Sequence, residues 1–171
     1  MSDSRDDRGA NLLGALSLAL VDRMRDATEQ AAGHGGGGPA ALVSIQEFLS
    51  GGSMDDLHKA LGLTPSGAVR LVDRLAADGY VERRSGANGR SLALALTPKG
   101  RRAAGRVRAA RGGAIDGVLD TLSRPDREAL VRITEKLVRA VTADRLALRR
   151  GGGDPGGWLC RLCHFDACGR G

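Results

Sequence analysis

The spacing of apolar residues along the chain predicts a mainly helical protein with one short β-hairpin. In six segments apolar residues recur at intervals of three and four, the period of one face of an α-helix. These segments are approximately residues 11–32, 40–49, 53–61, 64–78, 97–122 and 123–148. Between residues 80 and 97 the period changes to two, on both sides of the turn-forming stretch "SGANG", with Leu92, Leu94 and Leu96 alternating against small residues. That change of period predicts two antiparallel strands joined by a tight turn.

The residues at the ends of these segments support the helix boundaries. A hydroxyl side chain that can cap a helix N-terminus stands at the start of four of them: Ser53, Thr64, Thr97 and Ser123. Ser53 is followed three residues later by Asp56, the spacing of a capping-box variant. Gly62 and Gly79 stand where the third and fourth segments should end.

The order of the elements is that of a winged helix-turn-helix. Two short helices joined by a tight turn are followed by a hairpin, and longer helices lie on either side in the sequence. Those outer helices carry apolar stripes that need a partner, which favours a homodimer over a self-contained monomeric bundle. We therefore expect four parts: an N-terminal dimerisation helix and glycine-rich loop (1–38), a winged helix-turn-helix DNA-binding domain (39–97), C-terminal dimerisation helices (98–148), and a flexible linker with a cysteine-containing tail (149–171).

The positive charge of the chain is concentrated in its middle. The net charge is +6, and residues 64–111 hold eleven Lys and Arg against three acids, a local net charge of +8. Such a segment favours a polyanionic partner, and double-stranded DNA fits the predicted fold. Arginine is used far more than lysine, which suits phosphate and guanine contacts but is equally explained by an Ala, Gly and Arg-rich composition.

The predicted second helix of the helix-turn-helix and the predicted hairpin supply the candidate DNA contacts. The helix face opposite the core presents Ser66, Gly67, Arg70 and Arg74, and Thr64 stands at its N-terminus, where backbone N–H groups can donate to phosphate. Arg70 is the best candidate for a base contact in the major groove. The alternative is that Arg70 and Arg74 pair with Asp73 or Asp78 on a solvated face. In the hairpin Arg83, Arg84 and Arg90 bracket the tip, so a guanidinium can enter the minor groove, unless the wing is merely solvated.

The stretch "MDDLHKALGLTPSGAVRLVDRLAADGYVERRSGANGRSLALALTPKG" resembles the MarR family of bacterial transcriptional regulators, and the resemblance extends over about residues 10–148. It implies a homodimeric repressor or activator that binds a pseudo-palindromic site, with the first and the last two helices forming the dimer. Thr64, Ser66, Gly67 and Arg70 match the family's groove-facing positions, and Arg90 matches the arginine of its wing. Asn88, which is also a candidate DNA contact, stands where the family usually has an acid, which leaves at best a neutral hydrogen bond at the wing tip. Many family members bind small aromatic or phenolic ligands, so a small-molecule effector is a further partner to consider.

All three cysteines lie near the C-terminus, in "CRLCHFDAC". Cys160, Cys163 and Cys168, with His164 beside them, offer ligands for zinc or an iron-sulfur cluster. Reversible thiol oxidation and a tail without a role are the competing interpretations. Covalent haem attachment at C-x-x-C-H is disfavoured because the sequence has no export signal.

Several function classes are disfavoured by what the sequence lacks. No apolar run is long enough to span a bilayer and the N-terminal residues do not resemble a signal peptide, so we expect a cytoplasmic protein without membrane contact. No nucleophile elbow, phosphate loop or paired carboxylates indicate an enzyme. The alternative to a DNA-binding regulator is a metal- or redox-binding protein that uses the winged fold for protein contacts.

Overall fold

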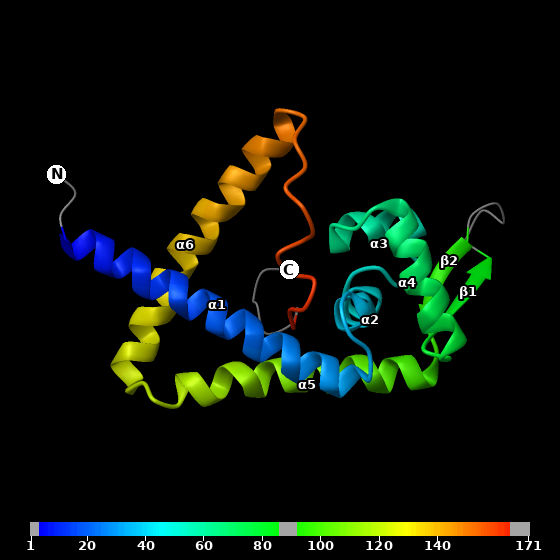
Figure 1. The fold of residues 1–171 in the computed structure, drawn as a ribbon, viewed down its shortest axis with the longest axis horizontal. Coiled ribbons are helices and arrows are strands. Elements are labelled where there is room, and N and C mark those ends of the chain that lie inside the picture. The colour runs from blue at the N-terminus through cyan, green and yellow to red at the C-terminus, as the bar shows by residue number, and fades with distance from the viewer. Residues whose placement is uncertain (1–3, 86–91, 165–171) are drawn as a thin grey trace.

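The computed structural model describes residues 4–85 and 92–164, and it confirms a mainly α-helical fold with a β-hairpin (Figure 1). The elements are α1 (Ser4–Ala32), α2 (Gly38–Glu47), α3 (Met54–Leu61), α4 (Pro65–Ala77), β1 (Val81–Ser85), β2 (Leu92–Leu96), α5 (Pro98–Leu119) and α6 (Arg124–Arg150). Three residues singled out in the sequence, Asn88, Arg90 and Cys168, lie outside the described residues. No helix in the described part is long and apolar enough to cross a membrane.

Helices α3 and α4 begin and end where the capping residues predict. The Ser53 hydroxyl accepts a hydrogen bond from the Asp56 N–H at 3.1 Å, and the Asp56 carboxylate accepts one from the Ser53 N–H at 2.9 Å, so the capping box is complete. Gly62 ends α3 with a φ of 66°, in the left-handed region that favours glycine. Thr64 then caps α4 through the N–H of Gly67 at 3.1 Å. Two helices are therefore joined by a turn short enough to fix their relative position.

The core of the helix-turn-helix is made by α2, α3 and α4 packing against one another and against the hairpin. Leu42 and Ile45 of α2, Leu57 of α3, and Val72 and Leu75 of α4 are all buried in one cluster. Burial of these faces leaves the opposite face of α4 in solvent, which is the face that carries the candidate DNA contacts.

The wing is a two-stranded antiparallel sheet in which Val81 lies opposite Leu96 and Ser85 lies opposite Leu92. Leu94 and Leu96 are buried as expected, but Leu92 is 62% exposed because it lies at the end of β2 that points away from the core. The other side of β2 is paired with the loop between α2 and α3: the Gly51 N–H donates to Leu94 O at 3.3 Å, and the Leu94 N–H donates to Gly52 O at 2.9 Å. The sequence did not predict this third segment of the sheet.

Helix α5 connects the winged domain to the long helices. Its first half is buried at Ala103, Ala104 and Val107, where α2 packs across it, and α1 lies along it (Figure 1). Arg108 of α5 pairs with Glu47 of α2 at 2.8 Å, and the Glu47 side chain is only 10% exposed. The long outer helix α1 and the winged domain are thus held together through α5.

Helix α6 leaves the end of α5 and carries no buried residue in the structure (Figure 1). After Arg150 the chain turns back toward α2 and α3 (Figure 1). The glycine-rich composition predicted a flexible linker here, whereas residues 156–162 make hydrogen bonds to the folded domain and place Trp158 and Leu162 against its core. The apolar side chains of the tail explain the difference, since they find an existing apolar surface to cover.

Two glycines of α5 should respond in opposite ways to replacement by alanine. A Cβ at Gly100 would overlap the carbonyl of Tyr80, whose carbon would lie 3.0 Å away, at the junction of wing and helix. We expect Gly100→Ala to destabilise the fold by roughly 1–3 kcal/mol, because backbone must move to make room. A Cβ at Gly105 would meet no atom within 4 Å, and Gly105→Ala should stabilise the helix by roughly 0.5–1 kcal/mol. Urea unfolding at one protein concentration measures both, and equal effects would contradict this account of the junction.

Candidate nucleic-acid interface

The exposed face of α4 carries the side chains that the sequence analysis assigned to DNA. Ala68, Leu71, Val72 and Leu75 turn inward, while Thr64, Ser66, Arg70 and Arg74 are exposed and Gly67 is partly covered. Within the described part of the chain, Arg70 and Arg74 have no hydrogen-bond or ion-pair partner. The interpretation that these two arginines pair with Asp73 or Asp78 is therefore wrong: Asp73 pairs with Arg83, and Asp78 with His34 at 3.2 Å.

The ion pair between Arg83 and Asp73 joins the wing to α4. Arg83 lies opposite the buried Leu94 in the sheet, so its side chain is on the face of β1 that looks toward the domain. Its guanidinium reaches the Asp73 carboxylate at 2.5 Å, with the Arg83 side chain 33% exposed. The next residue, Arg84, is on the opposite face and pairs with Glu82, which lies two residues before it on that same face. Arg83 and Arg84, which were both predicted from the sequence to contact DNA, are therefore in different environments.

Most of the basic residues between 64 and 111 interact with the protein itself. Lys99 donates to Asp78 O at 2.7 Å and lies over the Tyr80 ring. Further arginines of α5 bond to partners elsewhere in the chain: Arg101 to Leu96 O, Arg106 to Ala31 O, Arg108 to Glu47, and Arg111 to the Cys163 sulfur. In the described part of this segment the Lys and Arg side chains without such a partner are Arg70, Arg74 and Arg102. Two of the three are on α4, which concentrates the unpaired positive charge on the helix predicted to enter the groove.

The pKa shifts of α3 have local causes. A hydrogen bond from Lys59 at 2.5 Å, with a second from His58, lowers the pKa of the Asp55 carboxyl below its usual value. The same contact with Asp55 raises the pKa of Lys59. The N–H of Ser53 lowers the pKa of Asp56 through the capping box. These charges stabilise the helix that supports α4, and they give no sign of proton-transfer chemistry.

The cysteine-containing segment is only partly described, and the metal site assigned to it stays a prediction. Cys160 is exposed, while Cys163 and His164 are partly buried. The structure brings no three His, Cys, Asp or Glu side chains of residues 4–85 and 92–164 into a group that could hold a metal ion. The zinc or iron-sulfur ligand set proposed from the sequence also needs Cys168, which is outside those residues.

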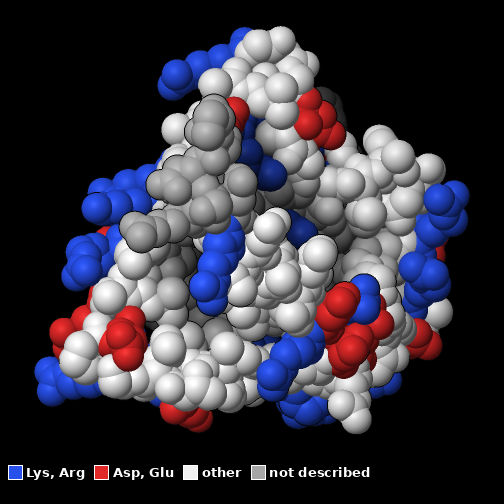
Figure 2. Space-filling model, turned by 60° about the vertical axis from the view of Figure 1, so that its left-hand side comes forward, with Lys and Arg blue, Asp and Glu red and all other residues white. Residues whose placement is uncertain are grey.

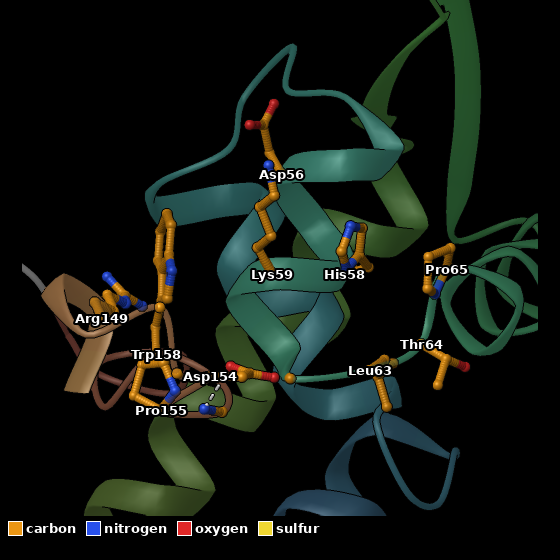
Figure 3. Close-up of a pocket in the computed structure, with 14 residues that line it drawn as sticks. Asp56, His58, Lys59, Leu63, Thr64, Pro65, Arg149, Asp154, Pro155 and Trp158 are labelled. Atoms are coloured by element: carbon orange, nitrogen blue, oxygen red, sulfur yellow. Dashed lines mark hydrogen bonds between the residues drawn. The ribbon is translucent and has the colours of Figure 1, made fainter.

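A cleft of about 760 Å³ lies between α3, the turn to α4 and the returning segment after α6 (Figure 3). Trp158 and Arg149 line one side of it, and Thr64 and Pro65 lie at the other (Figure 3). The segment is anchored next to this cleft: the Trp158 N–H donates to Ala60 O at 2.6 Å, and Arg145 of α6 donates to Gly156 O at 3.2 Å. The segment thus spans from the long helix α6 to the helix-turn-helix.

This arrangement of a helix-turn-helix, a charged wing and long outer helices defines a winged helix-turn-helix protein. The MarR family model matches residues 49–91, which include α3, α4 and β1. A search of curated proteins found no match. The protein therefore has a winged helix-turn-helix fold and is similar to the MarR family, by a sequence match over its central part and a fold match over most of its length.

Three solved structures illustrate the similarity. YusO of Bacillus subtilis is 21% identical, with a TM-score of 0.70 over 82% of this chain and 99% of that one. RV1404 of Mycobacterium tuberculosis is 26% identical, with a TM-score of 0.66 over 82% and 96%. The MarR family protein Rv2887 of Mycobacterium tuberculosis, solved in complex with DNA, is 23% identical, with a TM-score of 0.60 over 75% and 95%.

Two features of this interface were not predicted from the sequence. The pairing of Asp73 with Arg83 joins residues ten positions apart on different elements, and no local pattern indicates which acid an arginine will choose. The contact of the C-terminal segment with α3 depends on Gly157, whose Cα lies against the backbone of residues 60 and 61. The signal that could have found it was the run of glycines before Trp158, which permits close backbone approach.

Replacing Gly157 should release the C-terminal segment from α3. A Cβ at Gly157 would lie 2.6 Å from Leu61 C and 2.9 Å from Ala60 O. Both are backbone atoms, so a rotamer change cannot relieve the overlap. We expect Gly157→Ala to expose Trp158, the only tryptophan of the chain, and to shift its fluorescence emission to longer wavelength. Gly151→Ala is the control, because its Cβ would meet carbonyl oxygens at 3.5 and 3.7 Å, ordinary contact distances. An unchanged Trp158 emission in Gly157→Ala would show that this backbone contact does not hold the segment.

Proposed function

We propose that this protein is a homodimeric transcriptional regulator that binds a pseudo-palindromic DNA site through α4 and the wing. The observation that carries the proposal is the pair of exposed arginines on α4, Arg70 and Arg74, which the protein leaves without a partner among its described residues while most neighbouring cations are paired. Rv2887, a MarR family protein of similar fold, has been solved in complex with DNA, which supports the same use of the fold here.

The residues of the interface divide into three roles in this proposal. Arg70 contacts base edges in the major groove, and Arg74 contacts phosphate or base beside it. Thr64, Ser66 and Gly67 bring the N-terminus of α4 close to phosphate, where its N–H groups can donate. Arg83 is a positioning residue, since its pairing with Asp73 sets the angle of the wing. Arg84, Asn88 and Arg90 then supply the wing contact, as predicted from the sequence.

Homodimer formation is proposed from the apolar surface that the outer helices leave uncovered. Large apolar side chains are at least one-third exposed on both α1 and α6: Leu12, Leu13, Leu16, Leu18, Val21, Leu130, Val131, Ile133, Leu137, Val138, Val141, Leu146 and Leu148. Figure 2, in which the end formed by α1 and the α5–α6 corner is turned forward, shows broad uncharged areas between separated charged side chains. Contiguous apolar surface of this kind marks an interface. A second copy offers the same stripes and closes the assembly with two-fold symmetry.

A two-fold dimer places two copies of α4 on one side of the assembly, which matches two half-sites of a pseudo-palindrome. The sign of regulation, as repressor or activator, follows from where that site lies relative to a promoter. A small-molecule effector stays a prediction in this scheme.

Specific DNA binding is tested first by selection from a random-sequence duplex pool. We expect the protein to enrich one pseudo-palindromic sequence and its affinity to fall steeply with rising salt, since each phosphate contact releases counterions. Arg70→Ala should weaken binding to the enriched site by roughly 10- to 100-fold, with a smaller loss on the starting pool. Arg124→Ala removes an equal charge from the N-terminus of α6, where the side chain is 91% exposed, and should leave both affinities nearly unchanged. A pool that yields no preferred sequence would refute specific binding.

The dimer is tested by placing a charge on the apolar face of α6. Leu137→Glu puts a carboxylate in the middle of the proposed interface, and we expect it to convert the dimer to a monomer in analytical ultracentrifugation. Arg132→Glu introduces the same side chain on the opposite face of the helix and should leave the dimer intact. A Leu137→Glu protein that sediments as the wild type does would place the interface elsewhere.

A further inference from the structure

The two described cysteines stand at the first and last positions of a reverse turn. The Cys163 N–H donates to Cys160 O at 2.8 Å, the bond that closes a four-residue turn. Such a turn brings its first and last Cα atoms within about 7 Å, and a disulfide typically spans Cα atoms roughly 4.4–6.8 Å apart. The backbone of Cys160 and Cys163 is thus close enough for a disulfide without a change of fold in the segment.

The same turn is the part of the segment that contacts the domain. Between the two cysteines, the Arg161 carbonyl accepts a hydrogen bond from the fully buried Ser44 hydroxyl at 3.2 Å, and Leu162 packs against the core. Just before the turn, Trp158 meets Phe48 edge-to-face, with ring centroids 6.4 Å apart. The conformation of the Cys160–Cys163 turn therefore determines whether the segment can remain docked on α2 and α3.

The surroundings of the two sulfurs differ in a way that suits a two-step oxidation. Cys160 is exposed and can meet a solute, whereas Cys163 is partly buried with the Arg111 guanidinium 3.9 Å from its sulfur. The Arg111 contact thus holds the Cys163 sulfur beside α5, while Cys160 stays open to solvent.

We propose that Cys160 and Cys163 form a redox-sensitive dithiol whose disulfide locks residues 156–163 onto the winged domain. The oxidant is a peroxide. The Cys160 thiol gives up its proton and its sulfur attacks one peroxide oxygen, the O–O bond breaks, and the departing oxygen takes up that proton and leaves as water or an alcohol, with Cys160 now a sulfenic acid. The Cys163 thiol then gives up its proton and its sulfur attacks the Cys160 sulfur, the S–O bond breaks, and the departing hydroxide takes up that proton and leaves as water as the S–S bond forms. Two electrons pass from the two sulfurs to the peroxide.

The disulfide favours docking because it removes freedom that the undocked segment would otherwise have. Closing the turn covalently restricts residues 160–163 to conformations near the one that presents Arg161 O and Leu162 to α2. The contacts themselves stay the same, so oxidation acts on the equilibrium between docked and undocked forms. This inference does not depend on DNA binding.

The experiment compares full-length protein reduced under anaerobic conditions with the same protein treated with one equivalent of hydrogen peroxide. We expect oxidation to give a Cys160–Cys163 disulfide in peptide mapping and to lower acrylamide quenching of Trp158 by about twofold, because a preorganised segment spends more time docked. Cys160→Ser and Cys163→Ser should abolish both effects. Cys168→Ser is the matched control and should keep both, since it leaves the turn intact.

Three results would overturn the proposal. Loss of the response in Cys168→Ser would assign the disulfide to another pair. A Cys160–Cys163 disulfide that leaves Trp158 quenching unchanged, or raises it, would separate the chemistry from docking. Protection of both Trp158 and the thiols by zinc ions added to the reduced protein would show a metal site in place of a dithiol switch.

Discussion

The packing of α2 across the first half of α5 is the contact on which the other parts of the molecule depend. Small buried side chains at Ala103 and Ala104 allow α2 to approach closely, and the Glu47–Arg108 pair beside them is shielded from water on the Glu47 side. Separating the two partners of such a shielded pair would leave a charge without compensation, which is unfavourable. The pair therefore opposes any sliding of α2 along α5. Helix α2 supports α3 and α4, and α5 contacts α1 and leads to α6. This junction therefore fixes the position of α4 relative to the apolar surfaces of the outer helices.

The positive charge of residues 64–111 serves two purposes: some cations stabilise the fold, and others are exposed for a partner. A majority of its cations bind carbonyls or carboxylates within the fold, among them Arg101, Arg106 and Arg108 on α5. Arg70 and Arg74 have no ion-pair partner among the described residues, because the nearby acids Asp73 and Asp78 pair with Arg83 and His34. Cations that bond to carbonyls keep their charge but are held in place, so few side chains of the segment are free to turn toward a polyanion.

The sequence predicted the elements better than it predicted their contacts. Helix starts at Ser53, Thr64, Thr97 and Ser123 could be read because capping is local and involves residues three apart. The outward position of Arg70 followed from the period of α4. The pairing of Arg83 with Asp73, the contact of Gly51 and Gly52 with β2, and the docking of Trp158 on α3 could not be read, since each joins segments whose approach is decided by the whole core. The apolar stripe of α6 was predicted as a buried face, and it becomes one only if a second chain covers it.

The pairing of Gly51 and Gly52 with β2 also bears on solubility. A hairpin has two open edges, and each is a row of N–H and C=O groups that another chain could extend into an intermolecular sheet. In this wing the β2 edge is occupied by the α2–α3 loop at Leu94. The β1 edge stays open but bears Glu82, Arg83 and Arg84 in succession, and charged side chains discourage a neighbouring strand from joining. The wing can therefore lie exposed at the surface without pairing edge to edge with the wing of another molecule.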